Sequence, residues 1–219
     1  MKASTISIRM NTKQVQTLYT FGHAKWYDMF MHLWIPLVAR KAEQEFQEFM
    51  KQNCNSHTEI LELGSGTGRN LESFKKQKIP FKSYCGIDFS KAMLAIAKRK
   101  FQNYTNIEFK EGDISTVKEK RIFDLIICTW VLSHTQNPSE IVNHAQQFLK
   151  KNRKMYIICF TKPYWYINTW FYPLAKYLFK MKYVSEKEIQ NFQNLTKRRT
   201  RSHGMTTNIV LEKSGLSEL

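Results

Sequence analysis

A chain of 219 residues is long enough to bury a sizeable core and usually forms one domain, so we expect a single domain. Its 34 Lys and Arg against 18 Asp and Glu give a formal net charge of +16, which favours contact with nucleic acid or with anionic membrane surfaces. No apolar run approaches the roughly 20 residues that span a bilayer, and residues 1–16 lack the apolar stretch of a secretory signal, so we expect no integral membrane protein. The four cysteines include no C-x-x-C pair, which is typical of reduced thiols and predicts a cytoplasmic location.

Apolar runs alternate with helix-period segments through the middle of the chain, a pattern typical of βα units and a parallel sheet. Strands are predicted near residues 58–63, 83–87, 106–110, 123–129 and 154–160, and helices near residues 66–77, 90–101 and 138–151. Later, the S-x-x-E pattern that starts at Ser185 opens another helix, and residues 198–212 predict a hairpin around Gly204. The order of elements predicts an α/β, Rossmann-like core.

A glycine-rich turn follows the first predicted strand. Gly64, Gly66 and Gly68 can take positive φ and let the backbone approach a ligand closely, and the helix after them offers N–H groups at its start. Asp88 ends the second strand, about 20 residues downstream, where doubly wound folds place a carboxylate for ribose hydroxyls. The alternatives are a tight turn without a ligand and an Asp88 that caps the helix beginning near Ser90.

Two departures from the dinucleotide fingerprint decide which cofactor to expect. G-x-G-x-x-G would need glycine where Arg69 stands, so a pyrophosphate ligand is disfavoured. Glu62 lies two positions before Gly64, and a carboxylate that faces the turn suits a cationic amino group better than a phosphate.

At this point the chain resembles the class I S-adenosylmethionine-dependent methyltransferases, whose first motif is an acidic residue followed by x-G-x-G-x-G, here residues 62–68. Further segments follow in the family's order, at residues 21–28, 88–89, 107–114 and 123–130. The first of them is similar to the Tyr-Asp segment of the small-molecule, quinone and phospholipid branch. The resemblance implies a mostly parallel seven-stranded sheet with helices on both faces and a C-terminal antiparallel hairpin.

The resemblance also implies S-adenosyl-L-methionine as the cofactor and a set of residues that bind it. These residues are Tyr27, Glu62, Gly64, Ser65, Gly66, Gly68, Asp88, Phe89, Met93, Gly112, Asp113, Ile114, Thr129 and Trp130. His134, just past the fourth strand, is the candidate general base, and its alternative role is to cap a loop or to contact the cofactor. We expect no metal, because no acidic or histidine cluster with ligand spacing appears near the strand ends.

The methyl acceptor is the part of the function that the sequence defines least. The resemblance divides the domain into an N-terminal helical cap (1–51), a cofactor-binding core (52–160), and an acceptor-site segment with the closing hairpin (161–219). Aromatic and basic residues mix at 163–183, and apolar ones crowd 26–38, so we expect a small-molecule or lipid-like acceptor, such as a quinone precursor or an amino-phospholipid, and association with a membrane surface. The same residues could instead form an amphipathic cover on the sheet.

Two other functions stay open. The basic run at 197–201 favours an RNA methyltransferase, although it could be a solvated strand face and no N-P-P-Y type motif follows the fourth strand. A non-catalytic protein that binds S-adenosylmethionine is the second alternative.

Overall fold

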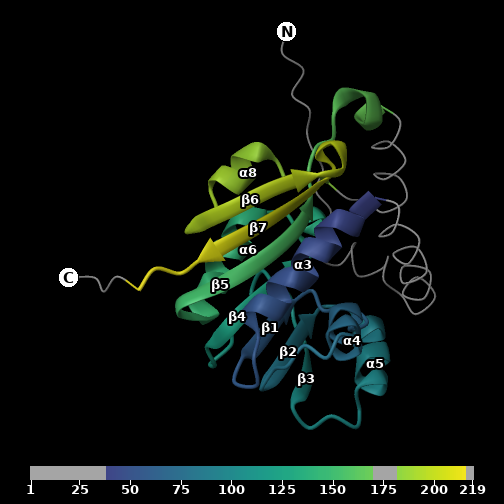
Figure 1. The fold of residues 1–219 in the computed structure, drawn as a ribbon, viewed down its shortest axis with the longest axis vertical. Coiled ribbons are helices and arrows are strands. Elements are labelled where there is room, and N and C mark those ends of the chain that lie inside the picture. The colour runs from purple at the N-terminus through teal and green to yellow at the C-terminus, as the bar shows by residue number, and fades with distance from the viewer. Residues whose placement is uncertain (1–37, 170–181, 216–219) are drawn as a thin grey trace.

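A seven-stranded sheet in the order β3-β2-β1-β4-β5-β7-β6 organises the computed structural model, which describes residues 38–169 and 182–215 (Figure 1). Its strands are β1 (Glu59–Leu63), β2 (Ser83–Asp88), β3 (Ile107–Glu111), β4 (Phe123–Thr129), β5 (Leu149–Phe160), β6 (Leu195–Arg201) and β7 (Thr206–Glu212). The α-helices are α3 (Arg40–Asn53), α4 (Arg69–Lys76), α5 (Lys91–Lys100), α6 (Pro138–Ala145) and α8 (Glu186–Gln190). Short 3₁₀ turns are η2 (Leu132–His134), η3 (Gln146–Phe148) and η4 (Ser202–Gly204), and residues 165–169 are helical.

The first five strands pair in parallel and the last two run antiparallel, as the sequence predicts. β1 lies between β2 and β4, β3 adds beyond β2, and β5 adds beyond β4. β7 then pairs antiparallel with both β5 and β6, which makes β6 an edge strand. The carboxyl ends of β1, β2 and β4 therefore meet at one edge of the sheet, where ligands of such folds bind.

Two apolar layers cover the faces of the sheet because neighbouring residues of a strand point to opposite sides. In β4, Leu125 and Ile127 join a core with Phe46 of α3 and Phe74 of α4, while Ile126 and Cys128 join a second core that includes residues of α6 and α8. Figure 1 shows α3 crossing one face of the sheet, and α6 on the other side. The predicted helices on both faces are thus confirmed.

One predicted helix and one predicted strand need correction. Helix α6 ends at Ala145 rather than near residue 151, and β5 begins at Leu149 rather than near residue 154. Leu149, whose side chain is buried, pairs with Phe123 in the β4–β5 ladder, and Lys150 Nζ lies 3.0 Å from Asp124 and 2.9 Å from Glu59 at the amino edge of the sheet. These contacts draw the chain into the sheet earlier than helix periodicity indicated.

The later elements follow the sequence closely. Ser185 caps α8 in the predicted capping box with Glu188, and the hairpin turns around Gly204. All four cysteines are buried as free thiols. Among the described residues, no helix combines the length and apolar character needed to cross a bilayer.

Candidate functional site

The glycine-rich turn between β1 and α4 lies at the carboxyl edge of the sheet. Gly64, Gly66 and Gly68 have φ of +74°, +53° and +80°, in the left-handed region that favours glycine. A Cβ on Gly64 would lie only 2.6 Å from Cγ2 of Val131, which follows β4. Only glycine therefore lets this turn pass so close to the end of β4.

The end of β2 binds three successive N–H groups of the turn. Gly64 and Ser65 donate to the carbonyl of Ile87 at 2.8 and 3.0 Å, and Gly66 donates to Asp88 Oδ2 at 2.8 Å. These N–H groups serve the turn itself and are not offered to a ligand. The turn is thereby held in one conformation before any ligand arrives.

Asp88 is a buried carboxylate, 7% exposed, between the turn and α5. Its Oδ1 accepts from the N–H of Ser90 at 2.8 Å, while Ser90 itself caps α5 by accepting from the N–H of Met93. Burial raises the pKa of the Asp88 carboxyl, and its bonds to the N–H groups of Ser90 and Gly66 oppose that rise. Asp88 is therefore no helix cap; it fastens the turn and borders the pocket described below.

Glu62 is more deeply buried still, at 2% exposure. It accepts hydrogen bonds from the Tyr84 hydroxyl and from Asn70 Nδ2, and the same Asn70 nitrogen lies 2.8 Å from Thr129 Oγ1. Burial raises the pKa of Glu62 to about 7, although the bonds from Tyr84 and Asn70 and the charge of Arg69 act against it. With a pKa of about 7, the Glu62 carboxylate gains a proton easily near neutral pH when no cation is near.

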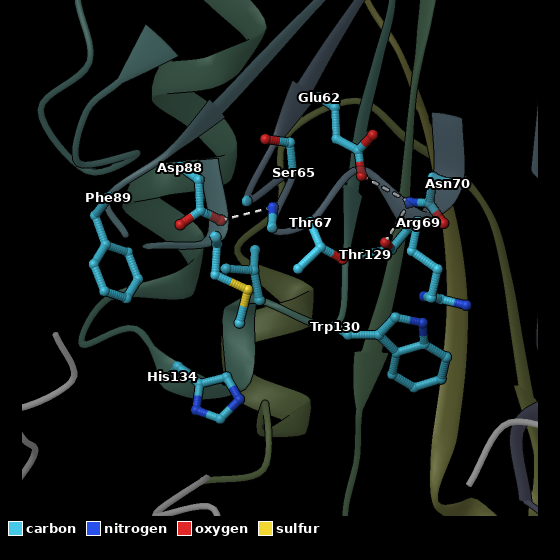
Figure 2. Close-up of a pocket in the computed structure, with 14 residues that line it drawn as sticks. Glu62, Ser65, Thr67, Arg69, Asn70, Asp88, Phe89, Thr129, Trp130 and His134 are labelled. Atoms are coloured by element: carbon cyan, nitrogen blue, oxygen red, sulfur yellow. Dashed lines mark hydrogen bonds between the residues drawn. The ribbon is translucent and has the colours of Figure 1, made fainter. Parts of the chain in front are cut away.

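A first pocket lies among these groups. It has a volume of about 70 Å³, and Figure 2 shows Asp88 and Phe89 on one side of it, with Arg69, Asn70 and Trp130 on the other. Its lining consists of Glu62, Gly64, Ser65, Gly66, Thr67, Arg69, Asn70, Asp88, Phe89, Met93, Thr129, Trp130, Val131 and His134. The structure thus brings together most of the residues that the sequence predicts as cofactor ligands.

A second pocket, of about 500 Å³, continues from the first past Asp88, Phe89 and His134. It adds the predicted Asp113 and Ile114, and also Ser115 and the residues that lead into α6. Asp113 Oδ1 accepts from both the N–H and the hydroxyl of Ser115, at 2.8 and 2.6 Å. The two pockets share Gly64, Asp88, Phe89, Val131 and His134, so they adjoin as one cleft at the carboxyl edge of β1, β2 and β4.

Two of the predicted site residues that the structure describes, Gly68 and Gly112, do not line this cleft. Gly68 turns the chain into α4, where a Cβ would meet the ring of Phe101 at 2.8 Å, so its role is close packing. Gly112 lines neither pocket. Tyr27 lies outside the described residues, as do most of residues 26–38 and 163–183.

His134 stands where the two pockets join. Withdrawal of its ring from water lowers the pKa of the imidazole to about 4, so it is neutral at physiological pH. An imidazole with so low a pKa is a weak base, and because it carries no charge it does not repel a cation in the same cleft. Within the described ranges, no three His, Cys, Asp or Glu side chains are grouped to hold a metal ion.

Four lining residues of the first pocket were not predicted from the sequence: Thr67, Arg69, Asn70 and Val131. Asn70 had a usable signal, because it lies in the first turn of the helix after the glycine turn and can face the strand that carries Glu62. Arg69 entered the prediction only as the position at which the dinucleotide fingerprint would need a glycine. The approach of Val131 to Gly64 depends on the pairing of β1 with β4 and has no local signal.

Comparisons with known proteins agree with this geometry. Residues 61–153 match the family model of a methyltransferase domain. The chain is 33% identical over 114 residues to a highly reducing polyketide synthase of Aspergillus sclerotiorum, covering 47% of this chain and 4% of the relative. It is 29% identical over 123 residues to the malonyl-[acyl-carrier protein] O-methyltransferase of Halalkalibacterium halodurans, covering 52% of this chain and 44% of the relative.

The chain therefore spans less than half the length of these curated relatives. Among solved structures, the N-methyltransferase NodS of Bradyrhizobium japonicum, in complex with S-adenosyl-L-homocysteine, superposes with a TM-score of 0.61 at 14% identity. That match covers 80% of this chain and 86% of NodS, and it agrees with the sheet order and the C-terminal hairpin described above.

Proposed function

Since the chain carries a domain of the class I S-adenosylmethionine-dependent methyltransferase family, we propose that its cleft binds S-adenosylmethionine and that the protein transfers a methyl group to a small organic acceptor. One observation carries the proposal. Two buried carboxylates, Glu62 and Asp88, flank a glycine turn that is already locked by the end of β2. A fold alone does not define an activity, and it is the chemistry of this site that supports a methyltransferase.

The donor set of the pocket fits such a cofactor. The Asp88 carboxylate is suited to accept from ribose hydroxyls, and Glu62 is suited to pair with an amino group. Arg69 supplies a cation for a carboxylate at the same end of the pocket. Ser65 Oγ and Asn70 Oδ1 are buried without a hydrogen-bond partner among the described residues, which a polar ligand beside them would relieve. Phe89 and Met93 offer apolar contacts to an aromatic base.

When bound, the cofactor would supply a sulfonium methyl group whose carbon a nucleophile on the acceptor attacks in line, with S-adenosylhomocysteine as the leaving group. The residues of the cleft then act mainly by placing the two reactants, and such placement can supply roughly 7–11 kcal/mol of barrier reduction. We propose that His134 contributes as a neutral hydrogen-bonding group at the junction of the pockets. Desolvation lowers the pKa of its imidazole to about 4, which favours this role over that of the general base predicted from the sequence.

For the acceptor, we propose a small molecule, with a lipid-like compound met at a membrane surface as the finer hypothesis. Tyr164, Trp165 and Tyr166 follow β5 and are 60%, 80% and 44% exposed, which supports an apolar partner. The curated relative that acts on a malonyl carrier protein supports an acyl compound as a further kind of small acceptor.

The ion pairs that the arginines of β6 form argue against the RNA alternative. Arg198 pairs with Glu186, and Arg199 and Arg201 both lie 3.4 Å from Glu45. This pairing lowers the positive charge that the strand presents to phosphates. The basic run is therefore better explained as part of the fold.

The proposal is tested by incubating the protein with methyl-labelled cofactor and fractionated cell extract. Label that enters a small or lipid-extractable compound supports the proposed function, whereas label found in RNA favours the alternative. Binding of S-adenosylhomocysteine without any transfer would identify a non-catalytic binding protein. No binding of S-adenosylhomocysteine would refute the proposal.

A further inference from the structure

Glu43 lies in α3, outside the first pocket, yet it contacts two residues that line it. Its Oε1 accepts from Arg69 Nη2 at 3.0 Å and from Trp130 Nε1 at 2.7 Å. The residue is only 9% exposed, so both contacts are largely shielded from water. One oxygen atom thus joins α3, the start of α4 and the end of β4.

The contact with Trp130 bears on the shape of the pocket because Trp130 has an unusual backbone. Its φ of +66° is in the left-handed region, which is unfavourable for a bulky side chain and persists only where surrounding contacts enforce it. Its N–H donates to the carbonyl of Ile158 at 2.8 Å, and its ring lies 4.8 Å from that of Phe160. The bond from the indole to Glu43 is the third such contact.

Residues on either side of Trp130 form part of the same pocket wall. Thr129 bonds to Asn70, which in turn bonds to Glu62, and Val131 lies against the turn at Gly64. A rotation of Trp130 toward an ordinary φ would therefore shift groups on both sides of the cofactor pocket.

The contact with Arg69 acts on the same end of the pocket. Arg69 is the first residue of α4 and follows Gly68, whose φ of +80° fixes the direction of the chain there. Glu43 binds one nitrogen, Nη2, of the Arg69 guanidinium, and Figure 2 shows the Arg69 side chain extending toward Trp130. The position of this cation relative to Glu62 thus depends on a carboxylate that lines no part of the first pocket.

We propose that Glu43 is a positioning residue, which holds Arg69 and the left-handed Trp130 in the arrangement that binds the amino-acid end of the cofactor. This inference deepens the proposed function and rests on it. The competing explanation is that Glu43 only fastens α3 to the core, in which case its loss would lower stability without changing the pocket.

The two explanations separate in a titration of S-adenosylhomocysteine with the variants Glu43→Gln and Glu43→Ala. Glu45→Gln is the matched control, because Glu45 lies on the same helix and, like Glu43, contacts two side chains. Its partners, Arg199 and Arg201, do not line the first pocket. We expect Glu43→Ala to weaken binding by about tenfold or more, Glu43→Gln to weaken it less, and Glu45→Gln to leave it within about twofold. In a Trp130→Phe background the effect of Glu43→Gln should shrink, since the shared contact is already lost. Unchanged affinity in folded Glu43→Gln and Glu43→Ala would overturn the inference.

A second readout needs no ligand. In protein labelled with ¹⁵N at tryptophan, the indole N–H signal of Trp130, identified by its loss in Trp130→Phe, should shift and exchange faster with solvent in Glu43→Gln but not in Glu45→Gln. An unchanged indole signal would show that Glu43 does not hold Trp130. A wild-type protein that does not bind S-adenosylhomocysteine would refute the proposed function, while the indole signal would still decide whether Glu43 positions this wall.

Discussion

Replacing Glu62 by glutamine should stabilise the free protein above neutral pH. Burial raises the pKa of Glu62 from 4.5 to about 7, so the folded state takes up its charge with difficulty. When the pKa of a carboxyl is higher in the folded state than in the unfolded state, its contribution to stability is fully present below the unfolded pKa and is lost as pH rises through the folded pKa. For Glu62 this loss begins above pH 4.5 and extends through about pH 7. At 1.36 kcal/mol per unit, the cost of the ionised carboxylate at pH 8 reaches about 3 kcal/mol. Glutamine keeps the shape and avoids the charge.

The assay is urea unfolding of the ligand-free wild type and Glu62→Gln at pH 5 and pH 8. The variant should be more stable by up to about 3 kcal/mol at pH 8, and the difference should shrink toward pH 5. Glu59→Gln is a control of opposite sign, because the bonds from Lys150 and Lys82 lower the pKa of Glu59, so that its loss should destabilise the protein at pH 8. A Glu62→Gln variant that is no more stable than wild type at pH 8 would refute the reasoning.

The same substitution should harm ligand binding. An ionised Glu62 attracts an ammonium group, so S-adenosylhomocysteine should bind wild type more tightly as pH rises from about 6 to about 7, where an α-amino group still keeps most of its protons. In Glu62→Gln the affinity should be lower and nearly independent of pH over this range. A variant that is more stable yet binds more weakly is the signature of a functional buried charge.

The remaining predictions concern the turn, the ribose carboxylate and the exposed aromatics. Asp88→Ala should weaken S-adenosylhomocysteine binding by about 1.5–3 kcal/mol, and calorimetry that finds wild-type affinity would remove Asp88 from the site. Gly64→Ala should lower the free energy of unfolding by at least about 1 kcal/mol, because Gly64 has a positive φ and a Cβ there would lie 2.6 Å from Val131. Gly112→Ala is the control and should change little, because its Cβ would meet nothing closer than 3.4 Å. Equal losses of stability in denaturant melts of the two variants would contradict this prediction. Trp165→Ser should reduce sedimentation with anionic vesicles if the acceptor is met at a membrane, and vesicles that never bind the wild type would rule that surface out.

Much of the fold follows from patterns that one strand or one turn carries by itself. The apolar runs of β1, β2, β3 and β4, the capping box at Ser185 and the hairpin around Gly204 were all predictable, because their signals are local. The end of α6 was not. The helix was predicted to continue to residue 151, but Leu149 and Lys150 already contact residues of β4 and β1, which are distant in sequence. The chain therefore joins the sheet at Leu149.

The candidate site divides in the same way. Glu62, the glycine turn and Asp88 were identified by their spacing, since a βαβ unit places the carboxyl ends of its two strands side by side. That Asp88 binds the N–H of Gly66, and that Asn70 bridges Glu62 and Thr129, depends on how three strands pair. The contact of Glu43 with Trp130 joins residues on α3 and at the end of β4, and no sequence pattern could indicate it. The lowered pKa of His134 likewise depends on its burial in the fold.

Thermal unfolding of the wild-type protein with and without S-adenosylhomocysteine tests the central claim most directly. At about 100 times its dissociation constant, a ligand that binds only the folded state adds roughly 2.7 kcal/mol, which should raise the melting temperature by several degrees. NAD at the same concentration should produce no comparable rise. Equal melting temperatures with and without S-adenosylhomocysteine at millimolar concentration would contradict the assignment of the cleft.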